Sequence, residues 1–130
     1  MTGVPPASPG QGSSTTGLDP NVASALAYLA GPLSGVLVLA AERSNADVRF
    51  HAWQSIIGLG ALWAIGFLLY GLAFTALFVS ATGFRVLLWL AVLAWAGWIV
   101  LWVMCLLKAF RGERWKIPLV GDYAERRSLP

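Results

Sequence analysis

The chain has 130 residues, enough for one domain, and 58% of them are hydrophobic while only 12% are charged. A soluble domain of this size carries about a quarter charged residues, so the composition argues against a soluble protein and indicates an integral membrane protein. The net charge is +3 and Cys105 is the one cysteine, which excludes an internal disulfide and a zinc site built from cysteines.

Residues 1–18 are rich in Pro, Gly, Ser and Thr and carry no charged side chain. Such a stretch buries too little apolar surface to offset the entropy lost on ordering, so we expect a disordered tail. The stretch lacks the basic start and the apolar core of a signal peptide.

An uncharged hydrophobic segment follows at about 22–41, long enough for a helix that crosses a hydrocarbon layer ~30 Å thick. The small and polar side chains of this segment share one helical stripe, which we expect to pack against another helix. They are Asn21, Ser24, Tyr28, Gly31, Pro32 and Gly35. Pro32 predicts a kink in the middle of the span. We interpret the kink as packed inside a bundle, and a broken helix that lines a site or pathway is the alternative.

The stretch DVRFHAWQS opens a second helix, which we predict over about 45–79. At ~1.5 Å per residue this helix is ~50 Å long, so its first turns lie at the membrane interface, a depth that suits Arg49 and Trp53. One stripe of the helix carries its polar and small side chains. The members of this stripe are Asp47, His51, Gln54, Ser55 and Gly58.

His51 is the only histidine of the chain. A metal or haem site needs further ligands, and no second histidine exists, so we expect no metal and no cofactor. We interpret His51 as a structural group with Asp47, one turn earlier, as its partner, in a contact that ties the first loop to the C-terminal tail. A response to cytoplasmic pH is the alternative.

A third helix is predicted over about 84–110, and Trp95, Trp98 and Trp102 recur along it at i, i+3 and i+7. Tryptophan usually prefers the membrane interface, whereas these three residues lie close to the middle of the span. Two interpretations stay open. The rings form a surface for lipid or for a partner subunit, or they pack against one another inside the bundle.

The chain ends in a basic tail over 113–130, with a short helix predicted from about Asp122. Lys116 complements the anionic lipid surface, and Pro118 enforces an irregular stretch before the short helix. We expect the tail to form a polar cap on the start of the second helix. The cap residues are Arg49, Glu113, Lys116, Pro118 and Asp122.

The predicted fold is an all-α transmembrane domain over 19–112 with three spans. Three crossings place one Lys or Arg residue, Arg85, on one side and eight on the other. Because cytoplasmic loops carry the excess of basic residues, we expect the N-terminus outside, the C-terminus in the cytoplasm, and a multi-pass protein of the bacterial cytoplasmic (inner) membrane.

Two stretches, VRFHAWQS at the start of the second helix and AFRGERWKIPLVGD after the third, resemble a family of small bacterial and archaeal multi-pass membrane proteins of uncharacterised function. That family is distantly similar to the membrane-embedded Tic subunit of the chloroplast protein-import machinery, which has four helices rather than three. The resemblance covers about residues 20–126. It implies a helical membrane domain and a role near protein translocation, and it supplies no catalytic residue.

The sequence contains no Ser-His-Asp spacing, metal-ligand cluster or glycine-rich phosphate loop, so we assign no catalytic residue and expect no enzyme. Spans without ionisable residues argue against ion-coupled transport. We expect an accessory, structural or assembly subunit of a larger membrane complex, in contact with lipids and with other subunits or itself, and not with nucleic acid. The alternatives are a translocon-like or channel-forming homo-oligomer and a lipid-binding protein.

Overall fold

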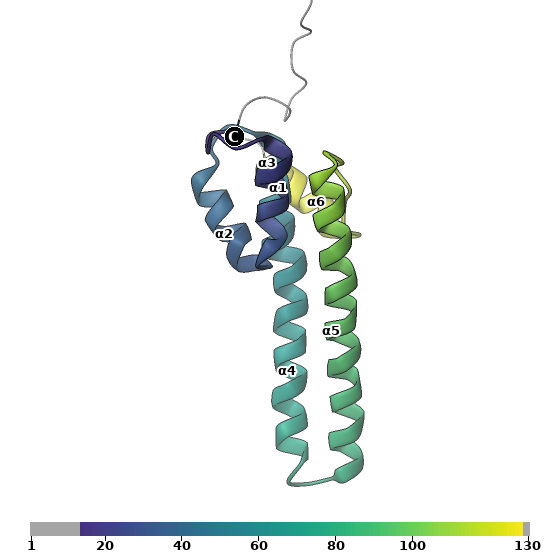
Figure 1. The fold of residues 1–130 in the computed structure, drawn as a ribbon. Helices are drawn as coiled ribbons and strands as arrows, with labels where there is room; N and C mark the ends of the chain where they lie inside the picture. Colours follow the sequence, from purple (N-terminus) through teal and green to yellow (C-terminus); the bar gives the residue numbers. More distant parts are fainter. Residues whose placement is uncertain (1–13, 129–130) are drawn as a thin grey trace, which may run out of the picture.

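The computed structural model describes residues 14–128, and every regular element among them is a helix. The all-α prediction is therefore confirmed for this part of the chain. Two long helices form a hairpin, and several short helices gather around one end of it (Figure 1). The predicted disordered tail at 1–18 lies mostly outside the described residues.

The first hydrophobic segment forms two helices instead of one. α1 spans Pro20–Leu29 and α2 spans Pro32–Ala41, ten residues each, and the two lie side by side (Figure 1). The chain reverses at Gly31, which has a φ of 64° that disfavours any residue with a side chain. A ten-residue helix is ~15 Å long, about half the thickness of a hydrocarbon core. The kink expected at Pro32 is thus a complete reversal.

The second hydrophobic segment is continuous but contains one irregular turn. α3 spans Ala46–Gln54, a π-helical turn covers Ser55–Leu59, and α4 spans Gly60–Ala76. The side chain of Asn45 caps the start of α3, because its oxygen accepts hydrogen bonds from the backbone amides of Asp47 at 3.0 Å and Val48 at 3.2 Å.

α5 spans Ala81–Phe110 and packs along α4 for much of its length (Figure 1). Ala46–Ala76 and Ala81–Phe110 are both long and apolar enough to cross a membrane, and they are the candidate spans of residues 14–128. The three-span count is not confirmed, because the segment expected to form the first span is split between α1 and α2.

The two ends of the described chain meet at the end of the molecule that carries the short helices (Figure 1). The backbone amide of Thr15 donates to both carboxylate oxygens of Glu42 at 3.0 and 2.9 Å. The last helix, α6 (Gly121–Ser128), packs against α3, and Arg49 donates to the carbonyl of Ser128 at 3.2 Å. The expected placement of the termini on opposite sides is not confirmed, because α1 and α2 return the chain to the end from which it started.

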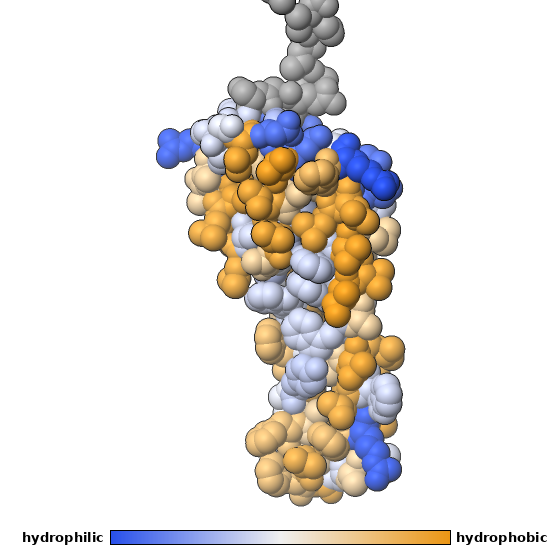
Figure 2. Space-filling view, viewed as in Figure 1, coloured by the Kyte–Doolittle hydropathy of each residue, from blue (hydrophilic) through white to orange (hydrophobic). Residues whose placement is uncertain are grey.

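Polar and apolar residues are separated along the long axis. Figure 2 shows most of the strongly hydrophilic residues gathered at the end with the short helices, a further hydrophilic patch near the opposite end, and apolar or near-neutral residues between them. Large apolar side chains are exposed along both long helices and on α2, where Leu37 is 70% exposed. Such a surface is stable in lipid and unstable in water.

Candidate functional site

Three buried polar side chains from two segments meet where the short helices join the long hairpin. The hydroxyl of Tyr28 lies 2.8 Å from Nδ1 of His51, and Nε2 of Gln54 donates to the same hydroxyl at 2.9 Å. The histidine tautomer decides which of the Tyr28 hydroxyl and Nδ1 donates in their contact. His51 also hydrogen-bonds the backbone of Glu113. We call Tyr28, His51 and Gln54 the Gln54 network.

Gln54 makes two further hydrogen bonds, both to the chain that follows α5. Its Nε2 donates to the carbonyl of Trp115, and its Oε1 accepts from the amide of Ile117, each at 2.9 Å. The side chain of Gln54 is fully buried. The amide therefore ties α1, α3 and the C-terminal segment together, and it has no spare group for chemistry.

Two long-range hydrogen bonds reach backbone carbonyls at the reversal between α1 and α2. The same carbonyls accept local bonds, Tyr28 from the amide of Gly31 at 2.9 Å and Gly31 from the amide of Gly35 at 3.2 Å. Ser55 donates to the carbonyl of Gly31 at 2.9 Å, and the indole of Trp102 donates to the carbonyl of Tyr28 at 2.7 Å. Ser55 begins the π-helical turn. These contacts fix the tip of the α1–α2 hairpin against α4 and α5.

A rim of ion pairs surrounds the Gln54 network. Asp47 pairs with Arg114, Glu113 pairs with Lys108 at 3.0 Å, and Lys116 pairs with Glu125 and, at 3.2 Å, with Asp122. Hydrogen bonds to those two carboxylates raise the pKa of Lys116. The side chains are partly exposed, so each pair contributes little stability.

Two of the predicted partnerships differ from the structure. Asp47 was expected beside His51 but pairs with Arg114, while the histidine bonds to Tyr28. Arg49 was expected in a polar cap together with Glu113 and Asp122. It donates instead to two backbone carbonyls, of Glu42 at 2.9 Å and of Ser128 at 3.2 Å, so it closes the end of the helical cluster. Pro118 lies in the irregular segment between α5 and α6, as expected.

Glu42 is a structural residue that the sequence pattern did not single out. It is fully buried at the end of α2 and accepts hydrogen bonds from Ser14, Thr15 and Ser44. Burial alone would raise the pKa of Glu42, but these hydrogen bonds outweigh it and lower the pKa to about 2. The sequence does contain a signal for Glu42, because this acid directly follows a long uncharged segment.

The glycines predicted to allow close packing all lie at tight contacts. A Cβ on Gly31 would lie 3.1 Å from the ring of Trp98, and a Cβ on Gly35 would lie 3.0 Å from the carbonyl of Ala52. A Cβ on Gly58 would lie 2.8 Å from the side chain of Ile117. Pro32 packs against Gly60 at the same hairpin tip. These positions bring α2 against the α3–α4 helix and the C-terminal segment against the π-helical turn.

Trp95, Trp98 and Trp102 form a tryptophan stripe that lies between helices, and their rings are half-buried. Trp95 packs on Gly66 and Tyr70 of α4, while Trp98 and Trp102 stack with ring centroids 5.8 Å apart beside the hairpin tip. Aromatic packing thus accounts for the inner edge of each ring. A lipid or partner contact through the remaining edges stays a prediction.

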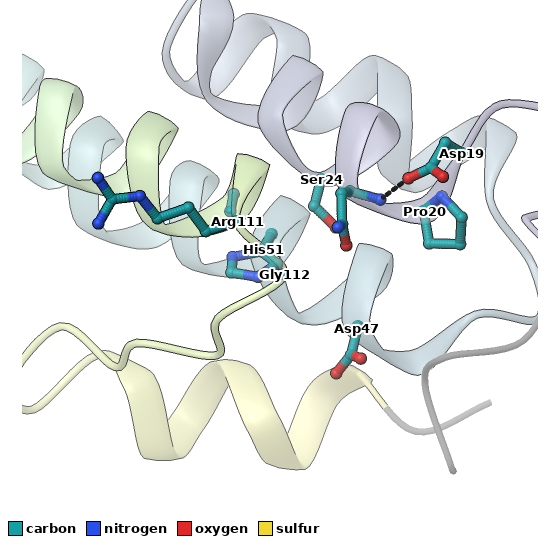
Figure 3. Close-up of a pocket in the computed structure, with 9 residues that line it drawn as sticks. Asp19, Pro20, Ser24, Asp47, His51, Arg111 and Gly112 are labelled. Carbon is teal, nitrogen blue, oxygen red and sulfur yellow. Dashed lines mark hydrogen bonds between the residues drawn. The ribbon is translucent and has the colours of Figure 1, made fainter. Parts of the chain in front are cut away.

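A cavity of about 320 Å³ opens beside the Gln54 network (Figure 3). It lies between the start of α1, the first turns of α3 and the end of α5. Its lining residues are Asp19, Pro20, Asn21, Ser24, Asp47, His51, Ala109, Arg111 and Gly112. Within residues 14–128, no group of three or more His, Cys, Asp or Glu side chains is arranged to hold a metal ion.

Residues 20–124 match the model of a family described as the magnetosome magnetite crystal formation protein family, MamF/MmsF. A UPF0132 membrane protein of Methanocaldococcus jannaschii is 36% identical over 121 residues, which cover 90% of this chain and 96% of the relative. A UPF0132 membrane protein of Archaeoglobus fulgidus is 36% identical over 107 residues, which cover 82% of this chain and 93% of the relative. No solved structure matches the chain.

These comparisons correct one expectation and leave another without support. The expectation that the protein is bacterial is contradicted, because the relatives named above come from archaea. The similarity to the Tic subunit is not shown. The expected membership of an uncharacterised membrane protein family is confirmed by relatives that are named membrane proteins and by a family model that covers most of the chain. The chain belongs to the MamF/MmsF family, together with archaeal UPF0132 membrane proteins.

Proposed function

We propose that this protein is a non-enzymatic membrane protein that serves as an accessory or assembly subunit of a larger membrane complex. The observation that carries the proposal is an outward face of α4 that has small residues on either side of Leu68, which is 62% exposed. Ala64, Gly71 and Thr75 are exposed at i, i+7 and i+11, and a Cβ on Gly71 would meet nothing within 4 Å. In lipid, small residues on an outward face let a second helix approach closely.

The buried polar groups support a structural role over a catalytic one. Gln54, His51 and Ser55 each bond to another part of the chain, and they hold the short helices on the long hairpin. A catalytic site needs groups that are free to reach a substrate. These groups instead build a rigid end on two long apolar helices.

We infer that two spans cross the membrane and that the α1–α2 hairpin enters it only partway. A hydrocarbon core of ~30 Å corresponds to roughly 20 helical residues, which reach from Ala76 back to about Ile57. The hairpin tip contacts Trp63 and Trp98, which lie below that level, and exposed Leu33 and Leu37 on α2 suit contact with lipid.

The same arrangement implies that both ends of the described chain lie in the cytoplasm. Eight of the nine Lys and Arg residues lie at the end with the short helices or flank it, and Arg85 lies near the turn between α4 and α5. The basic end faces the cytoplasm under the positive-inside rule. This orientation keeps the C-terminus where the sequence placed it and moves the N-terminus to the same side.

The test is purification of the tagged full chain in a gentle detergent, followed by measurement of mass and identification of partners. We expect a stoichiometric complex with other membrane proteins. Gly71→Leu should reduce that complex at least severalfold, because the larger side chain blocks close helix approach. The matched control is Gly97→Leu on α5, where a Cβ also meets nothing within 4 Å, and this variant should assemble normally.

Two results would overturn the proposal. One is a protein that purifies as a monomer from native membranes under every gentle condition. The other is a homo-oligomer that conducts ions in liposomes, which would establish the channel alternative. Equal loss of partners in Gly71→Leu and Gly97→Leu would contradict the assignment of the interface to α4.

A further inference from the structure

The α1–α2 hairpin presents an apolar surface that suits hydrocarbon. α2 contains no charged residue, and its outward side chains Leu33, Val36 and Leu37 are each more than half exposed. Large apolar side chains in such a position are stable in lipid and unfavourable in water. The outer face of α2 is therefore in contact with acyl chains.

The backbone at the hairpin tip is also satisfied from within the chain. The amide of Ala30 donates to the hydroxyl of Ser34 at 2.9 Å, and the amide of Gly31 donates to the carbonyl of Tyr28 at 2.9 Å. The Ser34 hydroxyl in turn lies within 3.2 Å of the carbonyls of Ala27 and Gly31. Irregular backbone is tolerated at membrane depth only with such internal partners, so the tip can lie in hydrocarbon.

Exposed cations indicate the depth of the hairpin. Arg43 follows α2 and Arg111 follows α5, both are exposed, and such side chains lie among lipid headgroups. The tip packs on Trp98, because a Cβ on Gly31 would be 3.1 Å from its ring. Trp98 precedes Arg111 by 13 residues, or ~20 Å along a 30-residue helix that is ~45 Å long. The hairpin therefore occupies one leaflet and ends near the middle of the bilayer.

The hairpin widens only one half of the long helical pair. Together α1 and α2 pack on α3, on the π-helical turn and on α5. Beyond the hairpin tip, α4 and the first half of α5 stand alone, and the molecule is narrower there (Figures 1 and 2). A helix with its side chains is ~10 Å across, so α1 and α2 add two helix cross-sections to one leaflet and none to the other.

We propose that this protein prefers curved membrane, with the leaflet that holds the α1–α2 hairpin on the convex side. Lipids in a convex leaflet are spread apart, so a protein that occupies more area in this leaflet than in the opposite one relieves the packing stress. Helices that insert into one leaflet are likewise sensitive to curvature. The partner is thus the lipid surface itself. The inference rests on the half-penetrating hairpin proposed above and is independent of the accessory role.

The test follows the purified full chain in giant vesicles of choline and glycerol phospholipids, from which a narrow membrane tube is pulled outward. A fluorophore on Arg126→Cys in a Cys105→Ala background marks the end with the short helices. An impermeant quencher distinguishes molecules with this end outside from molecules with it inside. Outside-facing molecules should be enriched in the tube at least about twofold over the vesicle, which requires only ~0.4 kcal/mol. Inside-facing molecules should be depleted, because their broad half lies in the concave leaflet.

Two paired substitutions change the two halves of the molecule separately. Leu33→Ala with Leu37→Ala thins the broad half, so the enrichment of outside-facing molecules should fall. The matched control is Leu90→Ala with Leu93→Ala on α5, because these leucines are also exposed but precede Trp98 and lie in the narrow half. This pair should keep or raise the enrichment. Alanine supports a helix at least as well as leucine, so both variants retain the fold.

Three results would overturn the inference. They are an equal distribution of both orientations between tube and vesicle, sorting of both orientations in the same direction, and equal loss of sorting in the two alanine pairs. Purification without any partner would refute the accessory role and leave the sorting unchanged. Reaction of cysteines at Ser44 and Arg126 from opposite sides of the membrane would refute the half-penetrating hairpin and the curvature preference together.

Discussion

Gln54 connects more separate parts of this molecule than any other side chain of the Gln54 network. It bonds to Tyr28 of α1 and to the backbone of Trp115 and Ile117 after α5. The bonds to Tyr28 and Ile117 are buried and the bond to Trp115 is partly buried, so their loss leaves donors and acceptors in surroundings that replace them poorly. Loss of Gln54 therefore lowers the free energy of unfolding both through the lost hydrogen bonds and through the groups that are left without partners.

Replacement of Gln54 by leucine should therefore lower the free energy of unfolding by about 2–4 kcal/mol, because at least one buried amide and one buried carbonyl lose their partners. Reversible unfolding of the purified protein in mixed detergent micelles measures this change. Thr75→Ala is the control, since the hydroxyl of Thr75 is exposed and bonds only to its own helix. A Gln54→Leu variant as stable as this control would contradict the role assigned to Gln54.

Glu42 gives the protein a pH dependence on the acid side. The pKa of Glu42 is lowered from 4.5 to about 2 in the folded chain, so its contribution to stability is complete above pH ~4.5 and is lost as the pH falls toward ~2. The contribution is roughly 3 kcal/mol.

The expected result is a fall in unfolding free energy between pH 5 and 2 that is absent in Glu42→Gln. The protection factor of the Thr15 amide, which is the intrinsic exchange rate divided by the observed rate, should fall over the same range, because this amide bonds to the Glu42 carboxylate. The measurement is amide exchange in detergent at a series of pH values. Identical acid profiles for the two proteins would disprove this assignment.

At the scale of elements, close contact between α4 and α5 depends on small residues that face large rings. A Cβ on Gly66 would lie 2.7 Å from the ring of Trp95, and this ring is also packed on Phe67 and Tyr70. A ring held on several sides cannot move aside at low cost. Gly71 lies five residues later on the same helix, and a Cβ added there would have no neighbouring atom within 4 Å.

Gly66→Ala should consequently destabilise the α4–α5 hairpin by about 1–3 kcal/mol through overpacking. Gly71→Ala should be neutral or stabilise by up to ~1 kcal/mol, since alanine has the higher helix propensity. Unfolding of both variants under identical detergent conditions measures the difference. Equal effects at the two glycines would show that the Trp95 contact does not control helix packing.

Helix positions could be predicted from the sequence more fully than helix partners. Hydrophobic length located α5 and the α3–α4 helix to within a few residues, since both depend on local composition. The partners of His51 and Arg49 could not be predicted, because Tyr28, Ser128 and the Glu42 carbonyl reach them only after the chain has folded. The one-stripe pattern of the second predicted helix did group Gln54 with Ser55, and both side chains are buried in the structure.

At the scale of the whole molecule, the α1–α2 hairpin changes the path of the chain relative to a membrane. A single span over 22–41 would place Ser44 and Ser14 on opposite sides. The structure places Ser14, Glu42 and the end of α6 together at one end. Two candidate spans then leave one short turn, at 77–80, at the other end.

Single cysteines in a Cys105→Ala background test this path. Cysteines at Ser44 and Arg126, both exposed, should react with an impermeant thiol reagent from the same side of the membrane, and a cysteine at Thr82 should react from the other. Labelling of intact cells and of inverted vesicles distinguishes the two sides. Reaction of the Ser44 and Arg126 positions from opposite sides would refute the half-penetrating hairpin.

Local composition is enough to predict that this chain is helical and apolar, because segment length, missing charges and cap residues act locally. It also located Gly31 and Pro32 as a break, since each residue's effect on the backbone is intrinsic. Whether the break is a kink or a reversal depends on contacts between residues that are far apart in the chain, and these contacts make it a reversal. Distant parts of the chain hold the reversal in place, because Ser55 and Trp102 donate hydrogen bonds to the carbonyls of Gly31 and Tyr28 in addition to the local bonds that these carbonyls accept.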